Sequence, residues 1–289
     1  MVQSSACPPA PLLTEVVRRV QEISTLPHVA LRVMEVANNP SSGATDLKCV
    51  LEQDPALSAR VLRCVNSSAY ALRQKITNLQ HAIGYLGVKQ VRNLAMTAAV
   101  SDLFRRDESC GTYRRSELWR HLVSVGVGAR MIALRMNFLN FEDMFLAGLL
   151  HDIGIILEDQ YLHEHFRHAL GQIADGQMFI EAERECLGFD HTVLGERVAE
   201  KWGFPETVRA AIRYHHGSER YRGEHTSLVQ CVEVANVICT LKGICSVGVK
   251  RAPFCRSAID GLSLTREDIL ALAEALDEEL SNSAALLAI

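Results

Sequence analysis

The sequence is poor in aromatic residues and has no surplus of positive charge. Phenylalanine, tryptophan and tyrosine make up 6% of the 289 residues, whereas leucine, alanine, glutamate and arginine recur throughout. This composition favours helices over sheets. The 30 basic and 34 acidic residues leave a net charge of −4. Nucleic-acid-binding proteins usually carry a basic surplus, so we expect no nucleic-acid partner.

Paired cysteines and long apolar runs are also absent from the sequence. Nine cysteines are scattered singly from Cys7 to Cys255, with no CxxC pair. That spacing is typical of reduced thiols in a cytosolic protein, rather than of a disulfide framework or a zinc ribbon. The longest nearly apolar run, residues 144–157, covers only about two-thirds of a bilayer span and contains Asp152. The first residues lack a basic segment and a long apolar core, so we expect no signal peptide, no membrane role and a cytoplasmic location.

Helical periodicity continues through most of the chain and predicts an all-α fold with two helical lobes. Three prolines within residues 1–11 predict a disordered N-terminal tail. An N-terminal helical lobe is expected over residues 12–104. A charged stretch without periodicity, residues 105–115, is interpreted as a hinge. The second helical lobe is expected over residues 116–241, and residues 242–289 are expected to form an irregular segment followed by a docking helix.

Several helix ends carry recognisable signals. Asp54 followed by Pro55 predicts a capped helix start, and Gly87 predicts a stop. Thr265 with Asp268 three residues later is a variant of the capping box. The helices expected in the first lobe are residues 12–24, 28–38, 45–53, 55–65, 79–86 and 89–104. Those expected afterwards are residues 116–136, 142–157, 162–174, 179–186, 191–202, 206–216, 228–241 and 266–280.

Several polar side chains fall on apolar helix faces, because residues three and four apart on a helix share a face. Asp152 lies inside the run FLAGLLHDIGIIL, where an unpaired buried carboxylate would be costly. One such histidine is most often a hydrogen-bonded core residue, but several on separate helices together with a carboxylate predict a shared polar centre. Imidazole and carboxylate ligands suit Mn, Fe, Zn or Mg. The residues concerned are His121, His151, Asp152, His191, His215 and Asn236.

The remaining histidines follow a different pattern. His163, His165 and His168 lie close together in one polar helix, and we interpret them as a solvated face rather than a metal site. The serines lack the context of a nucleophile elbow, and no glycine-rich phosphate loop is present.

The second half of the sequence resembles the HD superfamily of metal phosphohydrolases. The matching segments are Arg120-His121, LLHDIG at 149–154, DHTVLGERVAEKWGFP at 190–205 and AIRYHHG at 211–217. The last two segments resemble the additional histidine positions of the HD-GYP branch. This resemblance implies a metal set of His121, His151 and Asp152, with help from His191, His215 or His216. If activity is retained, it implies that His151 and Asp152 carry it.

The first half resembles the N-terminal half of the HDOD family. The segments that carry the resemblance are STLPHVALRVMEVANNP, LEQDPALSARVLRCVNSSAY and ITNLQHAIGYLGVKQVRNLAM. Both resemblances together cover about residues 20–240 and imply a two-lobed helical HDOD fold with an HD-like C-terminal lobe. They also imply a bacterial signal-transduction output module. Such a module acts through contacts with signalling proteins, such as receiver or cyclic-nucleotide-related proteins.

The chain departs from the catalytic pattern at three places. The distal aspartate of HD enzymes is replaced by Asn236, the lysine of the HD-GYP pattern by Ile155, and the Gly-Tyr-Pro segment by GSERYRG from Gly217. Asp152 alone would supply one negative charge against about four positive charges from two divalent ions.

We therefore expect a non-catalytic module with a vestigial or mononuclear metal site that includes Asn236. No cofactor beyond one such ion is expected. The alternative is a metal-dependent phosphohydrolase that acts on nucleotides or cyclic dinucleotides. Without a metal, Asp152 is expected to pair with protonated His121 or His151. The oligomeric state stays open.

Overall fold

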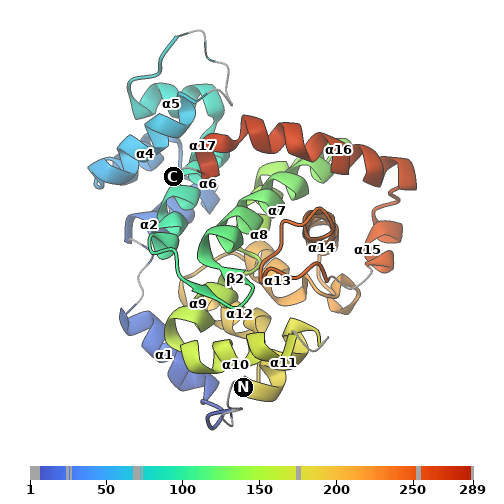
Figure 1. The fold of residues 1–289 in the computed structure, drawn as a ribbon. Helices are drawn as coiled ribbons and strands as arrows, with labels where there is room; N and C mark the ends of the chain where they lie inside the picture. The colour runs from blue at the N-terminus through green and yellow to red at the C-terminus, as the bar shows by residue number, and fades with distance from the viewer. Residues whose placement is uncertain are drawn as a thin grey trace.

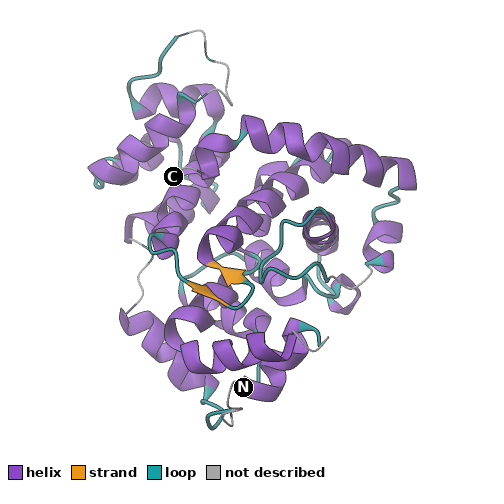
Figure 2. Ribbon diagram, in the orientation of Figure 1, coloured by secondary structure: helices purple, strands orange, loops and turns teal. Residues whose placement is uncertain are grey.

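The computed structural model describes residues 7–23, 26, 28–67, 72, 74–173, 177–251 and 255–287. Residues 1–6 of the expected tail lie outside the described residues, as do Ser24 and Ala174 at the ends of two expected helices. Residues 7–12 precede the first helix without regular secondary structure. Helices make up most of the described chain, and Figure 2 shows its one small pair of strands. The predicted all-α fold is confirmed.

The first half of the chain follows the expected helices closely. Asp54 caps α4 by accepting a hydrogen bond from the Leu57 backbone N–H at 2.9 Å, with Pro55 as the first helical residue. The side chain of Asn78 caps α5 in the same way, by accepting from the His81 backbone N–H at 2.8 Å. The elements are α1 (Leu13–Ile23), α2 (His28–Asn38), α3 (Ala44–Leu51), α4 (Pro55–Val65), α5 (Leu79–Leu86), α6 (Val88–Val100) and η2 (Ser101–Phe104).

The segment that was interpreted as a hinge contains a short β-hairpin. Strands β1 (Ser109–Cys110) and β2 (Tyr113–Arg114) pair antiparallel, and Gly111 adopts a φ of 57° in the turn between them. A left-handed backbone of this kind favours glycine. The buried core is continuous across this region and includes side chains from both halves of the chain. The division into lobes stays a prediction.

The second half contains the remaining helices. They are α7 (Arg115–Arg135), α8 (Phe141–Leu150), α9 (Ile153–Tyr161), α10 (His163–Ile173), α11 (Phe179–Leu187), α12 (His191–Lys201), α13 (Glu206–Tyr214), η3 (Ser218–Arg220), α14 (Thr226–Leu241), α15 (Arg256–Gly261), α16 (Arg266–Asn282) and α17 (Ala284–Leu287). The expected capping box of α16 is present, because Thr265 and Asp268 bond to each other's backbone N–H. The sequence did not predict α15 or α17.

The expected helix over residues 142–157 is wrong as a single element. It is divided into α8 and α9 at His151 and Asp152, where the Asp152 backbone leaves the helical region (φ −103°, ψ 20°). Apolar residues flank His151 and Asp152 on both sides, so periodicity alone could not locate the break. The break places two polar side chains at a helix junction inside the core.

Helices α7, α8 and α14 pack together at the centre of the second half, and α16 crosses α7 (Figure 1). Gly126 of α7 and Gly148 of α8 let the two backbones approach closely. A Cβ atom on Gly148 would lie 2.8 Å from the Gly126 Cα atom. Helix α1, although expected in the first lobe, packs against α9 and α12. Among the described helices, none has the length and apolar character required to cross a membrane.

Candidate metal centre

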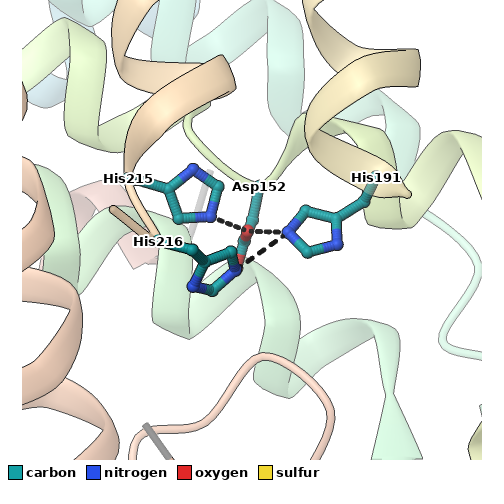
Figure 3. Close-up of side chains that lie close together, drawn as sticks. All are labelled: Asp152, His191, His215 and His216. Carbon is teal, nitrogen blue, oxygen red and sulfur yellow. Dashed lines mark hydrogen bonds and ion pairs between the residues drawn. The ribbon is translucent and has the colours of Figure 1, made fainter. Parts of the chain in front are cut away.

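The structure brings six of the seven predicted site residues into one buried cluster in the second half. Asp152 occupies the α8–α9 junction, and helices α7, α12 and α13 deliver histidines around it. Figure 3 shows Asp152 between three of these imidazole rings. The six residues are His121, His151, Asp152, His191, His215 and His216.

Three histidines lie on the Oδ1 side of Asp152. The Nε2 atoms of His215 and His191 lie 3.1 Å and 3.3 Å from Oδ1. The Nε2 atom of His216 lies 3.1 Å from the Nε2 atom of His191. These four side chains therefore direct their polar atoms at one point (Figure 3).

Two further histidines lie on the Oδ2 side. The Nε2 atoms of His151 and His121 lie 3.2 Å and 3.5 Å from Oδ2 of Asp152. Both rings are fully buried, and Asp152 is 1% exposed. Asp152 thus stands between two half-sites, with a separate set of imidazoles at each oxygen.

The hydrogen bonds of the ring Nδ1 atoms determine what the Nε2 atoms present to Asp152. The Nδ1 atoms of His121, His151 and His215 lie 2.8, 2.7 and 2.9 Å from the backbone oxygens of Ile244, Gly148 and Ile212. A carbonyl oxygen only accepts, so each Nδ1 carries the proton and donates it. When such a ring is neutral, its Nε2 atom presents a lone pair to the carboxylate.

Lone pairs that face a carboxylate at this range repel one another unless a cation lies between them. The Nε2 atoms of His121, His151 and His215 and the Oδ1 atom of Asp152 make no hydrogen bond of good geometry in the described chain. Burial lowers the pKa of His121 to about 4 and lowers that of His215, so both rings stay neutral near pH 7. Neutral imidazole whose Nδ1–H is fixed by an outer acceptor is the form that binds a metal.

His191 differs from the other histidines in its outer partner. Its Nδ1 atom lies 2.7 Å and 2.9 Å from the two carboxylate oxygens of Glu183 on α11. Burial alone would lower the pKa of His191, but the charge of Glu183, the hydrogen bond to Glu183 and the charge of Asp152 together outweigh burial and raise that pKa well above its usual range. The expected pairing of Asp152 with protonated His121 or His151 is therefore wrong for His121. In the metal-free cluster the raised pKa of His191 favours its cationic form. The pairing of Asp152 with protonated His151 stays a prediction.

The sequence analysis missed two buried acids behind the cluster. Glu183 contacts His191, and Glu158 of α9 is fully buried beside Glu183. Burial and the neighbouring Glu183 charge raise the pKa of Glu158 well above its usual range, so this carboxyl carries a proton. A signal was available, because Glu183 shares a helix face with Phe179 and Leu187. An acid on such a face needs a polar partner.

Asn236, the seventh predicted residue, lies on the wall of a small cavity that reaches the cluster. It is buried on α14, and its Oδ1 atom accepts a long hydrogen bond (3.5 Å) from Thr240. The cavity encloses about 50 Å³, enough for a few water-sized groups. Ile155, His191 and His216 line it as well. Two of the three sequence departures therefore lie beside the metal set.

The donor set fits a divalent metal ion. Metal–ligand bonds of about 2.1 Å place neighbouring ligand atoms about 3.0 Å apart in an octahedral site and about 3.4 Å apart in a tetrahedral one. The observed separations from Asp152 oxygens to Nε2 atoms are 3.1 to 3.5 Å. Such an ion would accept the unpaired Nε2 and carboxylate lone pairs. It would supply a Lewis acid that lowers the pKa of a bound water.

Comparison with known proteins identifies the family. The model of the HDOD domain matches residues 23–218, so the chain belongs to the HDOD family. It is similar to the crystal structure of an HDOD domain protein of unknown function from Geobacter sulfurreducens, with a TM-score of 0.78 and 28% identity over 95% of this chain and 96% of that chain.

Two further proteins are similar to the chain over part of their own length. One is a proposed signal transduction protein from Marinobacter aquaeolei VT8, with a TM-score of 0.75 and 25% identity over 99% of this chain and 62% of that chain. The other is an uncharacterized protein of Treponema pallidum, 23% identical over 236 residues, or 78% of this chain and 44% of that protein. The chain thus spans less than half the length of this curated relative.

Proposed function

We propose that the chain is a non-catalytic signalling module of the HDOD type, whose buried histidine cluster holds one divalent metal ion. The observation that carries this proposal is that Asp152 is the one carboxylate facing the ring Nε2 atoms among the described residues. Glu183 approaches only the outer Nδ1 atom of His191. The similarity to the Marinobacter protein supports a role in signal transduction.

Charge limits the cluster to one ion. A single divalent ion with Asp152 leaves one net positive charge, which the outer carboxylate of Glu183 offsets. Two ions with the same two carboxylates would leave two positive charges in a site that is almost fully buried, and burying uncompensated charge is costly. The position where HD enzymes place their second carboxylate is occupied here by the neutral amide of Asn236.

The protein would act through contacts of its helical surfaces with signalling proteins, such as receiver or cyclic-nucleotide-related proteins. The bound ion would hold α7, the α8–α9 junction, α12 and α13 in a fixed arrangement. The cavity beside His191 and His216 encloses about 50 Å³, whereas pockets for drug-sized ligands usually enclose about 300–1,000 Å³. A cavity of this size leaves little room for a nucleotide substrate, which supports a structural role for the ion.

The phosphohydrolase alternative is supported by the second half-site of His121 and His151, which resembles a place for a second ion. The signalling module and the phosphohydrolase differ in whether the protein hydrolyses a phosphodiester. Chelator-treated protein is supplied with Mn²⁺, which prefers nitrogen and oxygen ligands. It is then assayed with a chromogenic phosphodiester and a cyclic dinucleotide. We expect one bound ion and no turnover. Hydrolysis by the wild type that Asp152→Asn abolishes would establish the enzyme instead.

Asn236→Asp provides the matched variant for this assay. It adds a carboxylate beside a positively charged site without changing the size of the side chain, so Mn²⁺ should bind more tightly. Unchanged Mn²⁺ affinity in this variant would show that position 236 does not contribute to the metal set.

A further inference from the structure

Two cysteines and a histidine meet outside the histidine cluster, where the segment before α1 approaches α10 and α11. Cys7 lies in the segment before α1, His168 lies on α10 and Cys186 lies on α11. The two Sγ atoms and a ring nitrogen of His168 all lie within 4.8 Å of one another. Cys7 and Cys186 are 179 positions apart in the sequence, so only the fold brings them together.

Neighbouring contacts hold the N-terminal segment across these two helices. The Cys7 thiol donates to the Cys186 backbone oxygen at 3.7 Å, and the Cys186 thiol donates to Oε1 of Gln172 at 3.6 Å. His165 Nε2 lies 3.1 Å from the Pro9 backbone oxygen. Figure 1 shows this end of the chain beside α10 and α11. Of the histidines that we interpreted as a solvated face, His165 thus contacts the N-terminal segment and His168 lies within 4.8 Å of Cys7.

We propose that Cys7, His168 and Cys186 form a second metal site that binds Zn²⁺. Zinc prefers thiolate and imidazole ligands in a tetrahedral arrangement. In such a site, bonds of about 2.3 Å to sulfur place two sulfur atoms about 3.8 Å apart. The three side chains need to close by no more than about 1 Å to reach that spacing from a separation within 4.8 Å.

The charge balance of this site differs from that of the Asp152 cluster. Binding of Zn²⁺ releases one proton from each thiol, and the two thiolates neutralise the ion. The fourth position falls to the side-chain oxygen of Gln172, one turn after His168 on the same helix face, or to a water molecule. Cys186 is 3% exposed, whereas Cys7 and His168 are half-buried, so the ion can enter from solvent.

The site would fasten the N-terminal segment to one wall of the other metal centre. Residues 177–180, which connect α10 to α11 and begin α11, line the cavity beside His191. Phe179 also stacks on the His191 ring, with 6.1 Å between ring centroids and an interplanar angle of 17°. Zinc at Cys7, His168 and Cys186 therefore stiffens the helix pair that closes the histidine cluster.

Cobalt substitution distinguishes the two sites, because only the proposed site offers thiolates. Full-length, reduced, chelator-treated protein is titrated with Co²⁺, and the near-ultraviolet thiolate-to-cobalt charge-transfer band is recorded. Zinc content is measured in parallel on protein exposed to Zn²⁺ alone. We expect the band in the wild type, its loss in Cys186→Ser and Cys7→Ser, and a zinc affinity at least tenfold weaker in His168→Ala.

The controls separate this proposal from the function of the histidine cluster. Asp152→Asn should keep the charge-transfer band, and so should Cys49→Ser, which changes an exposed thiol on α3. If Cys186→Ser fails to fold, Cys7→Ser still tests the site, because Cys7 lies outside any helix. A wild type without the band, a band that survives both cysteine variants, or a Cys7–Cys186 disulfide that excludes zinc would overturn the proposal.

Discussion

Two buried aspartates at opposite ends of α9 have opposite surroundings. Asp159 Oδ2 accepts hydrogen bonds from the Arg115 guanidinium at 2.5 Å and from the Tyr113 hydroxyl at 3.1 Å. Its Oδ1 atom lies 3.1 Å from Nδ1 of His163. Asp152 is equally buried, but no guanidinium lies beside it among the described residues. Its neighbours are imidazoles, and those of His121 and His151 donate their Nδ1 protons to backbone oxygens.

The different surroundings of Asp159 and Asp152 indicate where the fold needs a bound ion. A buried carboxylate is stable only when a cation or donor network compensates its charge. The chain supplies that cation to Asp159 through Arg115. At Asp152 it supplies His191, while the neutral rings of His121 and His215 direct lone pairs inward. Asp159 thus belongs to a completed structural pair, whereas Asp152 belongs to a site that a metal ion completes.

The largest expected effect tests the completed pair. Asp159→Ala would leave the buried Arg115 guanidinium without its main partner, and we expect it to lower the free energy of unfolding by about 3–5 kcal/mol. Urea unfolding measures the loss. Glu108→Ala is the matched control, because Glu108 contacts the same guanidinium at 3.1 Å from a half-exposed position. It should cost only about 0–1 kcal/mol. Equal losses of unfolding free energy in the two variants would mean that burial does not determine how much the Arg115–Asp159 pair stabilises the fold.

A second change separates α9 from the histidine that it faces. A Cβ atom on Gly154 would lie 2.0 Å from the His191 backbone oxygen, so Gly154→Ala must move α9 away from α12. We expect a loss of about 1–3 kcal/mol in unfolding free energy and weaker Mn²⁺ binding, because Asp152 and His191 move apart.

Gly171→Ala serves as the control for this change. Gly171 lies on α10, and a Cβ atom there would meet nothing within 4 Å. Alanine at this position should stabilise the protein by about 0.4–1 kcal/mol and leave Mn²⁺ binding intact. A Gly154→Ala protein that binds Mn²⁺ like the wild type would argue against the role of this junction in the site.

A third prediction concerns the effect of a divalent cation on the stability of the protein. Free Mn²⁺ at one hundred times its dissociation constant should raise the unfolding free energy of the wild type by about 2.7 kcal/mol. Thermal unfolding with and without the ion measures the gain. Asp152→Asn should remove the response, whereas Glu108→Ala should keep it. An Asp152→Asn protein that Mn²⁺ still stabilises would place the ion elsewhere.

The smallest expected effect concerns Asp268, a partly exposed carboxylate. Hydrogen bonds from the Thr265 backbone and hydroxyl, together with Arg135 of α7, lower the pKa of Asp268 to about 2. A lowered pKa means that the carboxylate stabilises the fold above its ordinary value of 3.8 and that this contribution is lost as pH falls toward about 2. Melting temperatures of the wild type should therefore fall more steeply over this range than those of Asp268→Asn. Parallel curves would contradict this assignment.

The sequence predicted those features that depend on local signals. The start of α4 follows from Asp54 and Pro55, which act on neighbouring backbone groups. Histidines on apolar faces, such as His121 and His191, predicted a shared centre because a buried polar group must find a partner in the core. Both predictions rest on residue patterns within one helix, which can be recognised in the sequence.

Features that depend on tertiary contacts could not be predicted in this way. The break between α8 and α9 lies in a continuous apolar run, where no proline or glycine cluster marks it. The partnership of Glu183 with His191 depends on how α11 packs beside α12. The approach of Cys7 to Cys186 depends on the path of the N-terminal segment, which has no spacing signal.

One divalent ion is expected to accept the lone pairs of Asp152 and of the histidine Nε2 atoms beside it. Anomalous diffraction from crystals soaked in Mn²⁺ tests this expectation most directly, because each ion gives one peak. We predict a single peak about 2 Å from one Asp152 oxygen and from the Nε2 atoms of the histidines on that side of the carboxylate. Two peaks bridged by Asp152, or no peak within the cluster, would contradict the account.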